Sequence, residues 1–222
     1  NEGCIPTKTL LYSAKIYDAA VHGDKYGVKA ESVSFDFTKI VQRKDKVVRK
    51  LVAGVGAKMK AHNVTVVNGQ AMIKGRSGEG VEIECGGETY MAKKLLICTG
   101  SEAFVPPIPG VVEAGDIVMT NREILALKEQ PKSLVIIGGG VIGMEFASFY
   151  NSLGTEVTVV EMLPEILGGM DSEISAMLRD IYAKKGVKFN LSCKVTRIEG
   201  NEVFFTDIEN KESSVKGDRI LM

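Results

Sequence analysis

The sequence lacks a net charge, and this absence removes one group of functions from consideration. Its 222 residues include 28 lysines and arginines and 28 aspartates and glutamates. A balanced chain has no long-range field that would steer a nucleic acid or an anionic membrane towards it. The composition therefore favours chemistry on small molecules, with neither nucleic acid nor membrane as a partner.

The sequence also lacks a long uninterrupted apolar run. Its most apolar window, Leu134 to Tyr150, is broken by glycines and contains Glu145, which makes it a poor membrane span. A signal peptide is not visible either. The chain begins at Asn1 without a methionine and stops at Arg219-Ile220-Leu221-Met222, within what reads as a strand. We therefore expect a fragment of a longer protein.

Cysteines are few and widely separated, without C-x-x-C or zinc-ligand spacing. The four are Cys4, Cys85, Cys98 and Cys193. This pattern indicates neither a metal site nor a disulfide framework, and it fits a reducing cytoplasm. Cys85, Cys98 and Cys193 lie in or beside apolar runs, so we expect small buried side chains there.

A dinucleotide-binding βαβ unit is the clearest feature that is present. Leu134 to Ile137 is a short apolar run typical of a strand buried on both faces. Gly138-Gly139-Gly140-Val141-Ile142-Gly143 then has the spacing G-x-G-x-x-G, which provides a tight turn, close approach to a pyrophosphate and helix-on-strand packing. A helix from about Val141 to Ser152, ended by Gly154, would direct its N-terminus at the phosphates.

An acid completes this unit. Val157 to Val160 predicts the next strand, and Glu161 follows it, 21 residues after Gly140. An acid at that place can hold both ribose hydroxyls of an adenosine and repels a 2′-phosphate. Met162-Leu163-Pro164 offers no arginine in compensation, so NAD(H) is favoured over NADP(H). A simple strand-to-helix connection is the alternative. We expect nucleotide contacts from these residues: Gly138, Gly139, Gly140, Val141, Ile142, Gly143, Met144, Glu145 and Glu161.

A second candidate site lies near the start of the chain. Leu10, Leu11, Ala14 and Tyr17 predict an amphipathic helix, with Pro6 in its first turn. Cys4 would then lie at the helix N-terminus with Lys8 about one turn away. The helix dipole and the ammonium both favour a thiolate there. The alternative is a cysteine that merely precedes a helix.

The segment Gly3-Cys4-Ile5-Pro6-Thr7-Lys8, followed by Leu10-Leu11, resembles the redox-active segment of the flavin-dependent pyridine nucleotide disulfide oxidoreductases. The resemblance implies that Cys4 is the flavin-proximal member of a C-x-x-x-x-C pair whose other cysteine precedes Asn1. It also implies that Lys8 lies near the flavin and meets Glu145, with Cys4, Lys8 and Glu145 as catalytic residues.

Further cofactor contacts follow from the same resemblance. Thr99-Gly100-Ser101 looks like the segment beside FAD, and Ser101-Glu102 looks most like the branch that oxidises dihydrolipoamide. Ala71 would lie along the FAD adenine, and the backbone of Val195 would contact the nicotinamide nucleotide. The implied cofactors are FAD and NAD.

The whole pattern predicts an α/β fold with Rossmann-like FAD- and NAD-binding domains, parallel sheets and antiparallel excursions. We expect a partial FAD-binding domain over residues 1–110 and a C-terminally truncated NAD-binding domain over 111–222. Helices are expected over Ser34–His62, with Asp36 as N-cap, and over Asp171–Lys185, with four apolar residues on one face. Strands are expected over Val64–Ile73, Val81–Cys85, Glu88–Met91, Lys94–Cys98 and Val187–Leu191, in segments of Val195–Val215, and at Arg219.

The resemblance implies a cytoplasmic oxidoreductase that passes electrons from dihydrolipoamide through a disulfide and FAD to NAD. Its partner would be the lipoyl domain of a 2-oxo acid dehydrogenase or glycine cleavage complex, and the parent protein would be a homodimer. Three alternatives stay open: an NADPH-dependent disulfide reductase, a mercuric reductase, and a non-catalytic nucleotide-binding subunit.

Overall fold

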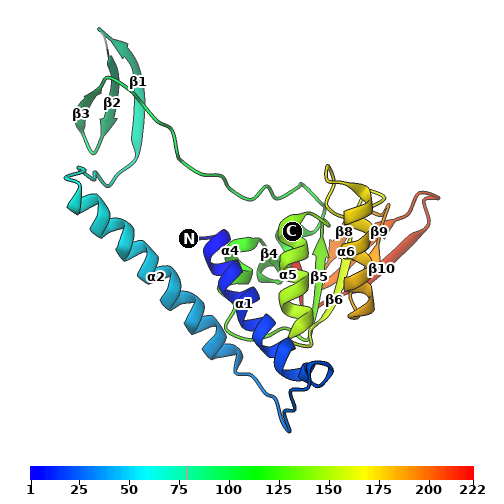
Figure 1. Ribbon diagram of the computed structural model, residues 1–222. Helices are drawn as coiled ribbons and strands as arrows, with labels where there is room; N and C mark the ends of the chain where they lie inside the picture. Colours follow the sequence, from blue (N-terminus) through cyan, green and yellow to red (C-terminus); the bar gives the residue numbers. More distant parts are fainter. Residues whose placement is uncertain (79) are drawn as a thin grey trace. The chain divides into compact units, whose positions relative to one another are not determined.

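A computed structural model describes residues 1–78 and 80–222, and the chain divides into two compact units (Figure 1). One unit combines Asn1–Arg49 with Ala103–Met222, and the other is Lys50–Glu102. The division follows contacts within the chain and does not test the expected boundary at residue 110, which stays a prediction.

A parallel sheet forms the centre of the larger unit. Its described strands follow the order β4-β11-β5-β6-β7, and every neighbouring pair is parallel. This confirms the predicted parallel sheet and the return of the chain to it at Arg219. The strands are β4 (Val118–Met119), β5 (Ser133–Ile137), β6 (Glu156–Val160), β7 (Lys188–Asn190) and β11 (Arg219–Leu221).

β5 lies inside the sheet and is buried on both faces. Leu134 and Ile136 are each 1% exposed and belong to the core between the sheet and the helices on one face. Val135, also 1% exposed, belongs to a second core on the opposite face. Side chains alternate between faces along a strand, so a strand covered on both sides must be apolar throughout. The short apolar run that predicted β5 reflects this burial.

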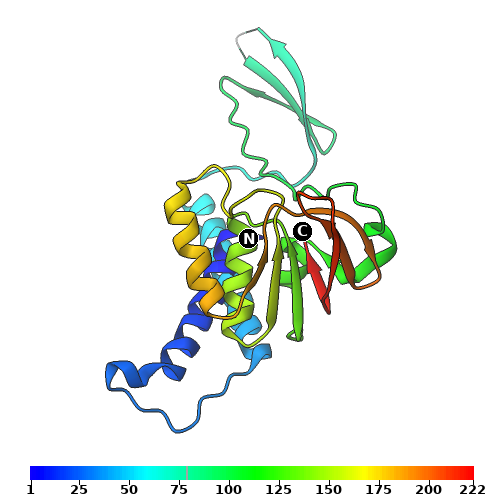
Figure 2. The same ribbon diagram turned by 90° about the vertical axis from the view of Figure 1, so that its right-hand side faces the viewer.

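Helices cover one face of the sheet (Figure 2). α1 packs against α5, and the first residue of α2 contacts α5 through the Phe37 ring, whose centroid lies 6.3 Å from that of Phe149. Asp36 accepts a hydrogen bond from Lys39 N at 3.0 Å, which confirms the predicted N-cap. The helices are α1 (Cys4–Val21), α2 (Phe37–Ala61), α5 (Val141–Ser152) and α6 (Ser172–Lys184).

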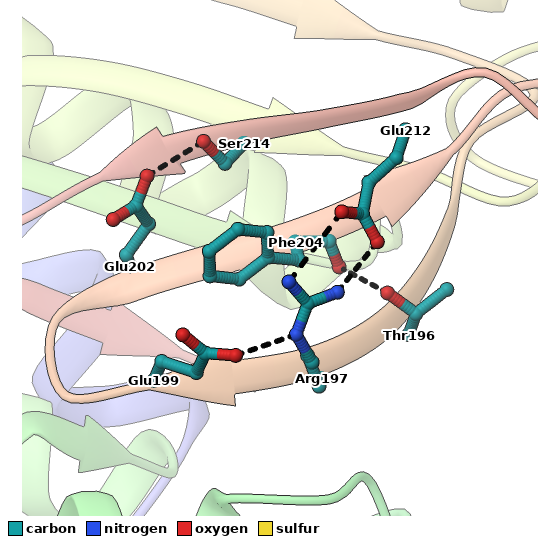
Figure 3. Close-up of polar contacts among 7 residues, drawn as sticks. All are labelled: Thr196, Arg197, Glu199, Glu202, Phe204, Glu212 and Ser214. Atoms are coloured by element: carbon teal, nitrogen blue, oxygen red, sulfur yellow. Dashed lines mark hydrogen bonds and ion pairs between the residues drawn. The ribbon is translucent and has the colours of Figure 1, made fainter.

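A small antiparallel sheet covers the other face. Its order is β10-β9-β8, and Val203 and Phe205 of β9 pack into the second core. On its outer side, the Arg197 guanidinium lies 3.7 Å from the Phe204 ring centroid and bonds to Glu199 and Glu212 (Figure 3). The predicted antiparallel excursion is therefore confirmed. Its strands are β8 (Lys194–Glu199), β9 (Glu202–Thr206) and β10 (Glu212–Lys216).

Short elements complete the larger unit. In α4, Thr120 and Glu123 form a capping box, and hydrogen bonds from Thr120 hold the pKa of the Glu123 carboxyl below its usual value. These elements are η1 (Gly23–Tyr26), α3 (Val111–Ala114), η2 (Gly115–Ile117) and α4 (Asn121–Leu125).

The smaller unit contains the rest of α2 and an antiparallel sheet of order β1-β2-β3. Gly86 and Gly87 both have positive φ, which confirms the predicted turn between β2 and β3. The predicted turn at Gly75–Gly78 is wrong in its bounds. β1 continues to Ser77, with a register shift at Gly75. The strands are β1 (Ala71–Ser77), β2 (Gly80–Cys85) and β3 (Glu88–Ala92).

Two strand predictions in this unit are wrong. Residues 64–70 and 94–98 form no strand, and Val66, Leu96 and Ile97 are 61%, 84% and 64% exposed. A strand needs a hydrogen-bonded neighbour, and the described strands of this unit pair only with one another. Cys98 is consequently exposed, contrary to expectation, while Cys85 and Cys193 are buried as predicted.

Candidate functional site

The glycine turn between β5 and α5 has the geometry that its sequence predicts. Gly138 has φ +105°, a value that favours glycine, and its N–H bonds to Val160 O at 2.9 Å. A Cβ on Gly143 would lie 2.4 Å from Gly138 O and 3.1 Å from Ile136 Cγ2. The third glycine is therefore required for the helix to approach the strand.

α5 begins directly after this turn, so its N-terminus lies at the turn. Gly140 is the N-cap without a side-chain cap, and the first helical bond runs from Met144 N to Gly140 O at 2.9 Å. The N–H groups of the first turn thus have no partner within the helix, as an anion site requires. Val141 and Ile142 are exposed at this end, whereas Met144 is buried beneath it.

Glu161 lies beside the turn, as expected. Its Oε2 accepts a hydrogen bond from Gly139 N, and its Oε1 accepts one from Leu163 N at 2.7 Å. The backbone of Glu161 bonds to β7 and to Cys193, which holds the residue at the carboxyl end of β6. The carboxylate is therefore fixed between the glycine turn and the segment that follows β6.

That following segment was not recognised in the sequence. Ile166 is 1% exposed and lies against Gly139, and Leu167 N bonds to Gly139 O at 2.8 Å. Leu167 has φ +56°, which is rare for a residue with a side chain. The one sequence feature that could have indicated this segment is the apolar pair Ile166-Leu167, between Pro164 and Gly168. Its contact with the glycine turn, however, depends on the path of the chain.

Cys4, Lys8 and Glu145 are brought together where α1 packs on α5. Cys4 is the first residue of α1 and is exposed. The Lys8 ammonium, one turn later, bonds to Glu145 Oε1, which confirms the predicted contact. This bond, with the charges of Glu145 and Cys4, raises the pKa of the Lys8 ammonium above its usual value. The catalytic roles of all three residues stay predictions.

Further contacts hold α1 in place. Asp18 Oδ2 accepts hydrogen bonds from Ser152 Oγ at 3.0 Å and from Lys185 Nζ at 3.1 Å, which link the C-terminal end of α1 to the ends of α5 and α6. At the other end, Glu2 bonds to Arg122 Nε at 2.6 Å and through its carbonyl to Asn121. The segment around Cys4 is thus tied to α4 and α5.

Apart from Lys8, the expected FAD contacts lie in the smaller unit. Ala71 begins β1 and pairs with Cys85. Thr99, Gly100 and Ser101 form an exposed irregular segment in which Gly100 has φ +79°. Their binding roles stay predictions, as does that of Val195, which lies in β8 opposite Phe205, next to a register shift in the antiparallel sheet.

Within residues 1–78 and 80–222, groups of three or more His, Cys, Asp or Glu side chains able to hold a metal ion are absent. None of the helices in those ranges combines the length and apolar character needed to cross a bilayer.

Known proteins similar to this chain are flavin-dependent enzymes by name or family. The chain is 43% identical over 225 residues to a dihydrolipoyl dehydrogenase of Acholeplasma laidlawii, covering 100% of this chain and 66% of the relative. It is 39% identical to a dihydrolipoyl dehydrogenase of Mycoplasma pneumoniae, covering 100% of this chain and 48% of that protein. The chain thus spans about half to two thirds of the length of these relatives.

Among solved structures, the HOCl-induced flavoprotein disulfide reductase RclA from Escherichia coli is similar, with a TM-score of 0.79 and 31% identity, covering 100% of this chain and 46% of that one. The family described as "Pyridine nucleotide-disulphide oxidoreductase" matches residues 1–222. Membership implies binding of FAD and NAD(H), and it confirms the predicted α/β class with Rossmann-like domains. The chain belongs to the pyridine nucleotide-disulphide oxidoreductase family.

Proposed function

We propose that the protein containing this chain oxidises dihydrolipoamide with NAD through a cysteine pair and FAD. The observation that carries the proposal is the Lys8–Glu145 contact, because it joins the cysteine-bearing helix α1 to the nucleotide helix α5. A thiol and a nucleotide site are then parts of one compact unit. The relatives named dihydrolipoyl dehydrogenase support the choice of substrate.

The nucleotide end of the proposed path uses the glycine turn. The first-turn N–H groups of α5 bind the pyrophosphate, and the Glu161 carboxylate accepts hydrogen bonds from the ribose hydroxyls of the adenosine. The Glu161 carboxylate repels a 2′-phosphate, which selects NAD over NADP.

The thiol end uses α1. Cys4 is the sulfur next to the flavin, and Lys8, held by Glu145, keeps a positive charge near it. Bound FAD would supply the two-electron acceptor and the hydride-transfer chemistry that connect the thiols with NAD. Thr99, Gly100, Ser101, Ala71 and Lys8 are the proposed FAD contacts, and Val195 is a proposed nicotinamide nucleotide contact. We further propose a cytoplasmic homodimer that works with lipoyl domains.

An NADPH-dependent disulfide reductase is the second candidate, because the similar solved structure is a flavoprotein disulfide reductase. The two are separated by steady-state assays of the full-length protein. Our proposal predicts turnover with dihydrolipoamide and NAD. Reduction of a disulfide by NADPH, without activity on dihydrolipoamide and NAD, would support the second candidate.

The role of Cys4 is tested by the full-length Cys4→Ser variant. After two-electron reduction, the unmutated protein should show long-wavelength absorbance from a thiolate-to-flavin complex, and the variant should lose it. If the variant keeps that absorbance, Cys4 is not the donor.

A further inference from the structure

The Glu161 carboxylate is oriented by a segment that the nucleotide motif does not include. This segment, residues 162–170, is called the β6 loop here. Leu163 N donates to Glu161 Oε1, and Gly139 N donates to Oε2. One donor belongs to the glycine turn and the other to the β6 loop. The carboxylate can therefore keep its orientation only while the loop keeps its place.

The β6 loop is anchored to the glycine turn at its centre. Leu167 N bonds to Gly139 O at 2.8 Å, and Ile166 is 1% exposed with its Cγ2 against Gly139. The loop is also bonded to the segment that follows β7, because Ser192 N donates to Leu163 O at 2.9 Å. Movement of the loop would disturb both donors of Glu161.

An ion pair connects the loop to α6. Arg179 Nε lies 3.0 Å from both carboxylate oxygens of Glu165, and Glu165 Oε1 also accepts from Ile166 N at 2.9 Å. The two side chains are 29% and 23% exposed. Glu165 thus links α6 to the buried anchor Ile166.

The pairing of Arg179 has a second consequence. Its Nη1 bonds to Asp180 Oδ1 at 2.7 Å, so two carboxylates engage this guanidinium. A 2′-phosphate needs a cation in place of the ribose-binding acid. Glu165 and Asp180 hold Arg179 in pairs that make it a poor phosphate ligand.

We propose that Glu165 and Arg179 are positioning residues that determine nucleotide specificity: their ion pair fixes the β6 loop, and the loop fixes Glu161 in the orientation that accepts NAD(H) and rejects a 2′-phosphate. This proposal rests on the proposed function of the glycine turn. It adds a determinant outside the motif, on α6.

The test is competitive titration of NAD and NADP against the protein and its Glu165→Gln variant. Loss of the charged pair is expected to weaken NAD binding about threefold to fivefold, in line with partly exposed ion pairs. NADP binding should be unchanged or stronger, so the ratio of the two dissociation constants falls. A merely structural role would weaken both nucleotides by the same factor and leave the ratio unchanged.

Two further variants secure the interpretation. Arg179→Gln should weaken NAD binding by the same factor, and the double variant should be no worse than either single one, because both remove the same contact. Because Arg179→Gln also removes the cation, it should not strengthen NADP binding. Glu202→Gln is the matched control. Its side chain is 25% exposed and forms an ion pair with Lys216 on the antiparallel sheet. It also accepts a hydrogen bond from Ser214 (Figure 3). It should change neither affinity.

The outcomes separate this proposal from the one on which it rests. If Glu161→Gln leaves NAD binding unchanged, the proposed nucleotide site is wrong. If Glu161→Gln changes the ratio of the two affinities but Glu165→Gln and Arg179→Gln do not, only the positioning role is overturned.

Discussion

The nucleotide unit from β5 to Glu161 and the segments at residues 64–70 and 94–98 both contain apolar runs, yet only the first forms the predicted structure. β5 has β11 and β6 as parallel neighbours within the same unit. The other two segments have no strand partner among the described residues of their own unit. Apolar composition therefore specifies a strand only where a neighbouring strand is present.

The largest expected effect comes from the core of the nucleotide unit. Phe146→Ala removes a ring that is 1% exposed, and it should lower the free energy of unfolding by about 3–5 kcal/mol. Leu96→Ser, in the unpaired segment, should stay within about 0.5 kcal/mol because the side chain is 84% exposed. Urea unfolding of both variants measures the contrast. Equal losses would mean that residues 94–98 are packed in solution.

The glycine turn offers the next test. Gly143→Ala places a Cβ against Gly138 O, and it should lower the free energy of unfolding by about 1–3 kcal/mol. The same variant should bind NAD more weakly. Gly140→Ala is the control, because a Cβ there meets nothing within 4 Å. That variant should keep its melting temperature, while the added methyl hinders the pyrophosphate. A stable Gly143→Ala protein that binds NAD normally would contradict the assigned geometry.

The Lys8–Glu145 pair should give a smaller effect on stability, of about 0.2–1 kcal/mol, because Lys8 is 59% exposed. Its effect on hydride transfer in the full-length protein should be larger and coupled. Lys8→Ala and Glu145→Ala should be non-additive in a double-mutant cycle of single-turnover rates. Additive losses would show that the residues act independently.

The same pair predicts the smallest effect, on the pH dependence of stability. The pKa of Lys8 is raised in the folded state by Glu145, so the folded state binds this proton more tightly than the unfolded state. The stabilisation is fully present below the ordinary lysine pKa of 10.5 and is lost as pH rises through the higher folded value. The free energies of unfolding of Lys8→Met and of the unmutated protein, measured from pH 8 upwards, should converge at high pH.

Sequence reasoning succeeded where local signals determine structure. The bounds of α5, the glycine turn and the Asp36 cap depend on residues close together in the chain. It also placed Lys8 against Glu145 through the family resemblance, which carries information on tertiary contacts. Their separation of 137 positions is beyond the reach of periodicity.

The failures share a physical cause. The exposure of Cys98 and the missing strands at 64–70 and 94–98 depend on partners that no local pattern reveals. Of the four apolar residues expected on one face of α6, Leu178 packs against the core, whereas Ile174, Met177 and Ile181 are exposed. The β6 loop was missed because its contacts with Gly139 arise only after β5 and β6 pair.

The most direct test of the account is calorimetric titration of NAD and NADP against the unmutated protein and Glu161→Gln. We predict that the unmutated protein binds NAD more tightly than NADP, and that removing the carboxylate charge narrows the difference. Tighter binding of NADP by the unmutated protein would contradict the assignment of Glu161 and of the nucleotide.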